Sequence, residues 1–325
     1  KEAREDLGCF TELCARYGVS TKTGYKWIER YEREGIEGLQ NQSRAPKNHP
    51  NQISEEIKEA ILEVRRAHAT WGPKKLRVLL ERADPKELWP MPSTIGDIIK
   101  CHGLSIPRMR RRRTPPSTQP FSDCNNANRV WCADYKGWFR TRDGRRCDPL
   151  TITDGFSRYL LRCQIVESLS YKVARGVFEA SFREYGLPMA IRTDNGTPFA
   201  SRGLAGLSRL SVWWLRLGIQ PERIKPGKPQ QNGRHERMHL TLKQETAQPP
   251  SQNLRAQQQR FNAFCQEYNE VRPHESLDMK TPASLYQPSP RCYPSRLPEL
   301  EYARGLETRV VGCDGEFYWK GNKIF

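Results

Sequence analysis

The spacing of apolar residues divides the chain into a helical first third and a strand-rich middle. Apolar side chains recur at helical spacing in residues 10–17, and Gly18 ends that helix. Ser20 is placed to cap a second helix over residues 21–34. Two short helices joined by a glycine-containing turn are typical of a helix-turn-helix, so we assign residues 1–45 to a first unit of this kind.

A second set of short helices is predicted after the Asn- and Pro-rich residues 45–52. Ser54 is placed to cap one helix, Pro73 lies near the start of the next, and Ser93 is placed to cap a third. Residues 53–105 are therefore interpreted as a second helical or helix-turn-helix unit.

From residue 129 the pattern changes to strands. It predicts strands over residues 130–139, 150–153 and 159–166, a helix over 170–185 and another strand over 189–192. The order βββ-α-β, followed by helices, is that of the ribonuclease-H-like fold. We assign this core to residues 123–290.

The last residues, 291–325, predict a small β segment. Strands are expected over 307–311 and 316–320, with a turn at 313–315, as in part of a small barrel. The predicted fold class is multidomain α/β: amino-terminal all-α helix-turn-helix units, a ribonuclease-H-like mixed-sheet core and this small carboxyl-terminal segment.

Charge and length narrow the function classes. The 325 residues suffice for two or three domains, and 54 Lys and Arg against 37 Asp and Glu give a net charge of +17, which favours a nucleic acid partner.

No apolar run predicts a membrane span or a signal peptide, so we expect a cytoplasmic protein. The 10 irregularly spaced cysteines are expected to be reduced, and the start at Lys1 without Met favours a fragment of a longer chain.

Basic side chains gather on the predicted helix over residues 21–34. At about 100° per residue, four of them fall within roughly 80° of one another, and we expect them to contact the DNA major groove. Glu29 interrupts this stripe, so a solvated face with i,i+4 ion pairs is the alternative. The four residues are Lys22, Lys26, Arg30 and Arg33.

A basic, Pro-rich stretch joins the helical units to the core. Residues 106–122 carry five arginines and no acid, and such a run cannot bury itself. We interpret it as a linker that contacts DNA phosphates, with a merely solubilising tether as the alternative. The arginines are Arg108, Arg110, Arg111, Arg112 and Arg113.

Three acids are candidates for one metal site. Asp134 lies inside an apolar strand, and Asp194 follows the strand over residues 189–192, where α/β sheets place their ligands. Glu236 begins a helix on which Met238 and Leu242 face inward. Taken singly, an Asp in a turn usually bonds its own backbone and a Glu in a first helical turn usually interacts with the helix dipole. Other acids read as turn residues: Asp143, Asp148 and Asp154.

Residues 235–239 read HERMH, which matches the HExxH pattern of zinc hydrolases. His235 and His239 would then be zinc ligands and Glu236 the general base. No clear third ligand follows, although His274 or an acid could serve. A zinc hydrolase would also leave the helix-turn-helix units and the two strand acids unexplained.

Several segments, taken in order, resemble the bacterial insertion-sequence transposases that share a retroviral-integrase-like catalytic core. Around the acids the segments read WCAD at 131–134, RTDNG at 192–196 and QNGRHERMH at 231–239. The segment that closes the core is also similar, with Asn269, RPH at 272–274, TPA at 281–283 and Tyr286. One departure is visible, because residues 195–235, 41 in number, separate the second acid from the third, a longer separation than in the integrase pattern.

The resemblance implies a site and a chemistry. Asp134, Asp194 and Glu236 would bind two Mg²⁺ ions, with Mn²⁺ able to substitute, and catalyse 3′-end cleavage and strand transfer of DNA. Lys228, Arg234 and Lys243 would hold the DNA backbone beside the metals. The partners would be the terminal repeats and target DNA, bound by a homodimer or higher oligomer associated with the bacterial nucleoid.

Two other functions remain open. A catalytically inactive or domesticated helix-turn-helix regulator would keep the DNA-binding units and use the core as a scaffold, although retention of all three acids argues against it. A ribonuclease-H-type nuclease would share the metals, but would leave the two DNA-reading units unexplained.

Overall fold

The computed structural model describes most of the chain, and the fold class predicted from the sequence is confirmed. The chain divides into two compact units, Lys1–Ser54 and Glu55–Phe325. None of the helices in the described part combines the length and the hydropathy needed to cross a bilayer. The described residues are 9–41, 52–106, 124–201, 206–224, 233–297, 305, 307, 309 and 317–324.

The first unit holds helices α2 (Phe10–Arg16) and α3 (Thr21–Glu34), followed by a 3-10 helix, η1 (Gly35–Leu39). The hydroxyl of Ser20 accepts a hydrogen bond from the backbone N–H of Thr23 at 3.2 Å, so the predicted cap is confirmed. Gly24 lets the two helices approach closely, because a Cβ there would lie 2.6 Å from the sulfur of Cys14.

The apolar face of α3 is only partly buried. Trp27 and Ile28 are half-buried, whereas Tyr31 is 38% exposed, and no described side chain of α3 is fully buried. Two short helices offer too little surface to cover three large side chains.

The second unit begins with helices α4 (Glu55–Ala67), α5 (Pro73–Ala83) and α6 (Pro92–Cys101), which pack around fully buried Ile61, Leu76 and Ile95. The prediction that Ser93 caps the third helix is wrong. That helix begins two residues earlier, with Met91 as its N-cap, because Pro92 already has the φ of a first helical position, and Ser93 lies inside the first turn.

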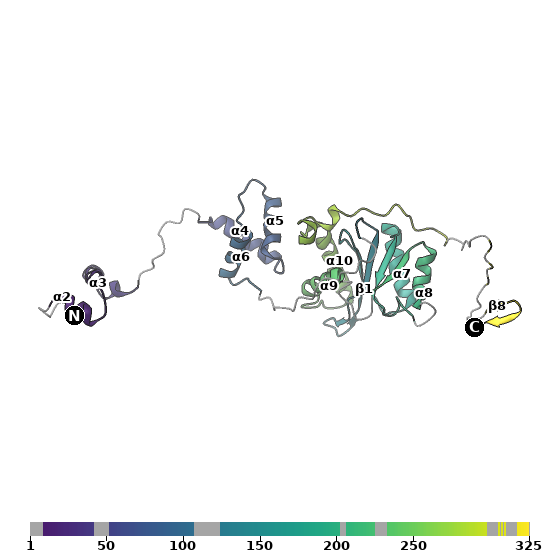
Figure 1. Ribbon diagram of the computed structural model, residues 1–325, viewed down its shortest axis with the longest axis horizontal. Helices are drawn as coiled ribbons and strands as arrows, with labels where there is room; N and C mark the ends of the chain where they lie inside the picture. Colours follow the sequence, from purple (N-terminus) through teal and green to yellow (C-terminus); the bar gives the residue numbers. More distant parts are fainter. Residues whose placement is uncertain are drawn as a thin grey trace. The chain divides into compact units, whose positions relative to one another are not determined.

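A five-stranded mixed sheet forms the core, in the order β5-β4-β1-β6-β7 (Figure 1). The pairs β1–β4 and β4–β5 are antiparallel, and β1–β6 and β6–β7 are parallel, which is the ribonuclease-H-like arrangement. The strands are β1 (Val130–Tyr135), β4 (Pro149–Asp154), β5 (Leu160–Ile165), β6 (Ala190–Thr193) and β7 (Gln220–Arg223). A short hairpin, β2 (Phe139–Arg140) and β3 (Arg146–Cys147), lies between β1 and β4.

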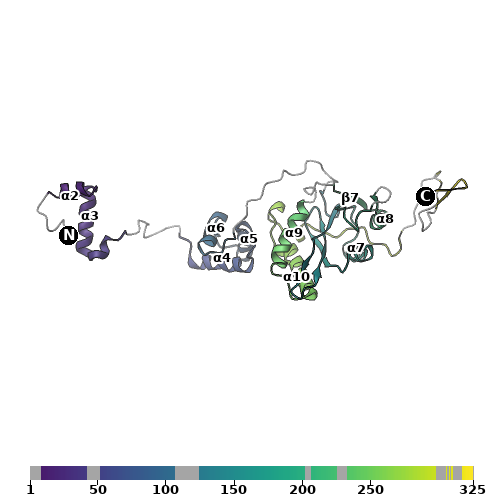
Figure 2. The ribbon, with the colours of Figure 1, turned by 90° about the horizontal axis from the view of Figure 1, so that it is seen from below.

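Helices cover both faces of this sheet (Figures 1 and 2). Helices α7 (Tyr171–Tyr185) and α8 (Arg209–Arg216) cover one face, and α9 (Gly233–Thr246) and α10 (Leu254–Gln266) cover the other. Because side chains alternate along a strand, Trp131 and Ala133 of β1 enter the core under α7. Asp134 consequently faces α9.

The edge strand β5 is covered by amide side chains. Gln258 of α10 accepts from the N–H of Ile165 at 2.8 Å and donates to the carbonyl of Cys163 at 2.8 Å. Asn269 accepts from the N–H of Leu160 at 2.8 Å and donates to its carbonyl at 3.0 Å. These bonds satisfy backbone groups that a sheet edge otherwise leaves unpaired.

The carboxyl-terminal segment contains a hairpin of β8 (Phe317–Trp319) and β9 (Asn322–Ile324). The turn lies at 320–321, where both residues have positive φ. The strand predicted over 316–320 corresponds to β8, whereas the turn predicted at 313–315 lies outside the described residues.

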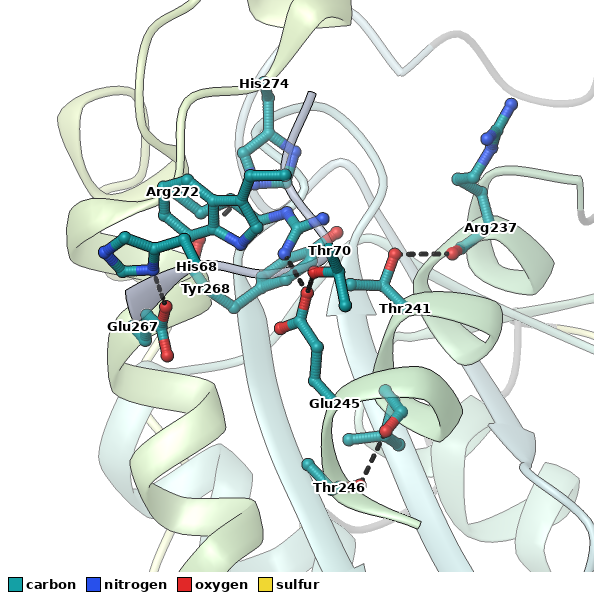
Figure 3. A network of polar contacts seen from close by, with 12 residues as sticks. His68, Thr70, Arg237, Thr241, Glu245, Thr246, Glu267, Tyr268, Arg272 and His274 are labelled. Carbon is teal, nitrogen blue, oxygen red and sulfur yellow. Dashed lines mark hydrogen bonds and ion pairs between the residues drawn. The ribbon is translucent and has the colours of Figure 1, made fainter. Parts of the chain in front are cut away.

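Polar contacts join the α4–α6 helices to the α9–α10 side of the core (Figure 3). Glu245, near the end of α9, accepts from the hydroxyl of Thr70 and forms an ion pair with Arg272 at 2.5 Å. The Arg272 guanidinium lies 5.1 Å from the ring centre of Trp71, and His68 lies 2.9 Å from a carboxylate oxygen of Glu267. This network fixes the end of α9 from two directions.

We predict that Glu245→Ala lowers the free energy of unfolding by about 3 kcal/mol, because it leaves the Arg272 charge buried without a carboxylate. The two side chains are 15% and 9% exposed. Urea unfolding followed by circular dichroism measures the change. The control is Glu179→Ala, which removes an exposed i,i+4 pair with Arg183 and should cost less than about 0.5 kcal/mol. Equal losses in the two variants would contradict the prediction.

Candidate active site

Asp134 and Asp194 lie side by side at the ends of two parallel strands. The pairing of β1 with β6 runs from Val130 opposite Ala190 to Cys132 opposite Arg192. Continuing that register by two residues places Asp134 level with Asp194, on strands about 4.8 Å apart. Both acids therefore stand at the carboxyl edge of the sheet.

Helix α9 brings Glu236 to the same region. Met238 and Leu242 are buried against the sheet as predicted, and Glu236 is exposed on the other side of the helix. Burial, and then the negative charges of Asp194 and Glu236, raise the pKa of Asp134 to about 7. The three carboxyl groups thus act on one another electrostatically.

The chemistry of these donors fits a divalent metal, since carboxylate oxygens are the ligands that Mg²⁺ prefers in proteins. Their positions are not those of a closed ligand cage. Among the described residues, no three His, Cys, Asp or Glu side chains come close enough together to hold one metal ion.

Two lysines flank the acids, and one of them was missed by the sequence analysis. Lys136 is half-buried, and its pKa is lowered by burial and then by the charge of Lys243, while Asp134 acts in the opposite sense. Lys243 is exposed on α9, seven residues after Glu236. Lys136 was detectable, because residues two apart in a strand point to the same side and Asp134 precedes it by two.

The HExxH histidines are buried packing residues. The Nε2 atoms of His235 and His239 both lie 2.7 Å from the hydroxyl oxygen of Thr151. Thr151 donates its proton to the carbonyl of Asp134 at 3.0 Å, so both imidazoles must donate to it. Neither Nε2 then keeps a lone pair for a metal, which disfavours the zinc hydrolase.

The same bonds attach α9 to the sheet. His235 also lies 2.9 Å, through Nδ1, from the hydroxyl of Thr153. The Nδ1 atom of His239 lies 3.9 Å from a carboxylate oxygen of Asp134. Burial lowers the pKa of His235 to about 3 and that of His239 to about 2, so both rings are neutral.

The acids interpreted as turn residues have structural partners. Asp154 accepts from the N–H of Asn128 and from the N–H and hydroxyl of Ser157, all within 2.8 Å. Asp148 forms an ion pair with Arg146 at 2.6 Å. The carboxylate of Asp143 accepts from a threonine hydroxyl at the hairpin tip.

The predicted DNA-contact residues fall into two environments. On α3, Lys22 and Lys26 are exposed, Arg30 is half-buried over the ring of Trp27 at 5.3 Å, and Arg33 forms an ion pair with the neighbouring Glu34. In the core, Arg234 donates to the carbonyl of Gly155 at 3.1 Å, which gives it a structural contact. Other predicted contacts lie outside the described residues: Arg108, Arg110, Arg111, Arg112, Arg113 and Lys228.

The sheet order and the helices on both faces define a core of the ribonuclease-H-like class. Family models described as "Integrase core domain" match residues 125–229 and 217–282, and models described as "Homeodomain-like domain" match residues 3–40 and 23–99. Residues 125–282 are thus similar to integrase core domains, and residues 3–99 to homeodomain-like domains.

Curated relatives include insertion-element proteins. The chain is 25% identical over 242 residues to the insertion element IS407 uncharacterized 31.7 kDa protein of Burkholderia multivorans, covering 73% of this chain and 82% of the relative. It is 26% identical over 240 residues to the insertion element IS476 uncharacterized 39.2 kDa protein of Xanthomonas euvesicatoria, covering 73% of this chain and 66% of the relative. The chain is related to bacterial insertion-element proteins, as the sequence resemblance indicated.

Solved structures with a similar chain include retroviral integrases. One is the simian T-cell lymphotropic virus intasome in complex with a PP2A regulatory subunit, with a TM-score of 0.43, 17% identity and coverage of 77% of this chain and 80% of that chain. Another is the HTLV-2 integrase catalytic core domain in complex with magnesium, with a TM-score of 0.40, 16% identity and coverage of 50% and 98%.

We predict that stability falls as the pH is lowered from 6.5 to 5. The unfolded chain takes up protons near pH 6.5 at His235, His239 and His274, which stay neutral in the fold because burial lowers the pKa to about 3, 2 and 3. Asp134 opposes this, since its raised pKa makes the fold bind a proton that the unfolded chain has lost. Three imidazoles outweigh one carboxyl, and averaged over this range the net loss is about 2 kcal/mol per pH unit.

Urea unfolding at pH 6.5, 6.0, 5.5 and 5.0 measures that slope. His239→Gln should reduce it by about 1 kcal/mol per pH unit, whatever its effect on stability at neutral pH. His102→Gln is the matched control, because His102 is exposed. A slope unchanged in His239→Gln would show that His239 is not buried neutral.

Proposed function

We propose that this protein is a DNA transposase that binds the terminal repeats of its insertion element and catalyses metal-dependent 3′-end cleavage and strand transfer into target DNA. The observation that carries the proposal is the placement of Asp134 and Asp194 at one sheet edge, with Glu236 close enough to raise the pKa of Asp134. Relatedness to insertion-element proteins and the integrase core match support it.

Asp134, Asp194 and Glu236 are the proposed catalytic and metal-binding residues. Two Mg²⁺ ions, or Mn²⁺ in their place, would polarise the scissile phosphate and stabilise the attacking and leaving oxygens. The HTLV-2 core domain, a structural neighbour, was solved in complex with magnesium. The acids supply oxygen ligands, and their mutual repulsion favours binding of a cation.

Lysines complete the proposed site. Lys243 stands on the same helix as Glu236, and Lys136 follows the strand that carries Asp134. Their ammonium groups are placed to hold phosphates of the DNA backbone beside the acids. Helix α3, with Lys22 and Lys26 exposed, is proposed to read the terminal repeat in the major groove.

The assembly is proposed to be a homodimer or higher oligomer on double-stranded DNA, because two element ends must be joined to one target. Its place of action would be the bacterial nucleoid in the cytoplasm. The basic linker at 106–122 would add phosphate contacts between the helical units and the core.

Strand transfer tests the acids directly. A labelled terminal-repeat duplex is incubated with plasmid DNA and Mg²⁺, and Asp194→Asn is expected to reduce joining at least about 100-fold while keeping electrophoretic binding of the duplex. The control is Asp278→Asn, since Asp278 is exposed and asparagine tolerates its left-handed backbone. Joining by Asp194→Asn at the wild-type rate would remove Asp194 from the site, and binding without joining by wild type would favour the regulator.

Salt dependence tests the DNA-reading helix. The affinity for the terminal-repeat duplex should fall steeply with salt, and replacing both Lys22 and Lys26 by alanine should make the slope of log K against log salt shallower by about 2. Lys172→Ala, an exposed lysine on α7, is the control and should leave the slope unchanged. A slope unaffected by the double substitution would assign DNA reading to another surface.

A further inference from the structure

Trp138 is the one exposed tryptophan of the protein. All eight tryptophans lie in the described part of the chain, and Trp138 alone among them is exposed, at 55%. It lies between β1 and β2, four residues after Asp134. Folding does not explain so much exposed aromatic surface at this position.

Two arginines lie over this ring. The guanidinium carbons of Arg140 and Arg146 are 5.8 Å and 5.3 Å from the ring centre of Trp138. Arg140 is opposite Arg146 in the β2–β3 ladder, and like charges directly opposite one another destabilise a hairpin. Asp148 compensates Arg146, but among the described residues no carboxylate lies within ion-pair distance of Arg140, which donates to the carbonyl of Gly144.

The rest of the hairpin is held in place. Phe139 and Cys147, on its other face, join the core beneath α10, and the rings of Phe139 and Phe261 are 6.4 Å apart. At the tip, the N–H groups of residues 142 and 143 donate to the carbonyls of residues 251 and 252, both at 3.0 Å. The face of the hairpin that carries Trp138, Arg140 and Arg146 is therefore held in a fixed position on the core.

We propose that Trp138, Arg140 and Arg146 bind an unpaired nucleotide at the DNA end beside the three acids, an inference that rests on the proposed function. The indole and the guanidinium planes offer stacking surfaces for a base, and the two positive charges attract its phosphate. A base inside a duplex has no free face for such stacking, so the ligand is a nucleotide outside the pairing. The hairpin would hold this nucleotide aside while the paired strand reaches the acids.

The test compares two DNA duplexes of the same sequence, one blunt and one with a three-nucleotide single-stranded 5′ extension that contains 2-aminopurine. Binding is measured in EDTA, so that no cleavage occurs. Wild type is expected to bind the extended duplex about ten-fold more tightly and to quench the 2-aminopurine fluorescence on stacking. Trp138→Ala should lose both the preference and the quenching, and Trp138→Phe should keep most of each.

The charge contribution has a matched control. Arg140→Ala should weaken binding of the extended duplex several-fold more than binding of the blunt one. Arg183→Ala removes a guanidinium that lies 5.1 Å from the ring centre of Tyr293, on the α7 side of the core, and should change neither. Circular dichroism melting of each variant verifies the fold.

The outcomes separate this inference from the proposed function. Retention of the preference and quenching in Trp138→Ala overturns the nucleotide site, even if wild type performs strand transfer. Their loss in Trp138→Ala supports the site, even if wild type fails to join any DNA, a result that would count against the transposase alone. Equal binding of the two duplexes by wild type also overturns the site.

Discussion

The hydroxyl of Thr151 is the contact on which the arrangement of the site depends. It donates to the carbonyl of Asp134 on β1 and accepts from both imidazoles of α9, so one side chain joins the strand that carries the first acid to the helix that carries the third. With His235 and His239 directed at the sheet, the adjacent Glu236 is exposed on another side of α9. The neutral, buried histidines therefore attach α9 to the sheet. The three carboxyl groups are left for the proposed binding of metal ions.

Electrostatic strain is concentrated at that edge. Asp134 is held in a place where burial and two other carboxyl groups oppose its ionisation, and Lys136 is held where burial and Lys243 oppose its own. A fold selected only for stability would avoid both arrangements. Under the proposed function, a bound cation would relieve the first of these repulsions and the phosphates of the DNA would relieve the second. In the ion pair between Glu245 and Arg272, near the end of α9, the two opposite charges instead neutralise each other.

The features that depend on residues close together in the sequence were predicted correctly. Helix α3 begins and ends at the predicted residues because a serine cap and a glycine define it, and Asp134 was found because an acid in an apolar strand is costly. Strand β7 was not predicted, because its residues read Gln-Pro-Glu-Arg; its Glu222 is buried through an ion pair with Arg192, the residue in register on β6. The role of His235 and His239 depended on Thr151, 84 residues away from the first, which no spacing rule reveals.

The amide side chains on β5 bear on how copies of this chain can meet. Gln258 and Asn269 occupy the outward N–H and carbonyl groups of that strand, so a visiting strand would have to displace four hydrogen bonds before it could pair. This makes β5 a closed edge, at which a strand of another chain cannot extend the sheet without first breaking those bonds.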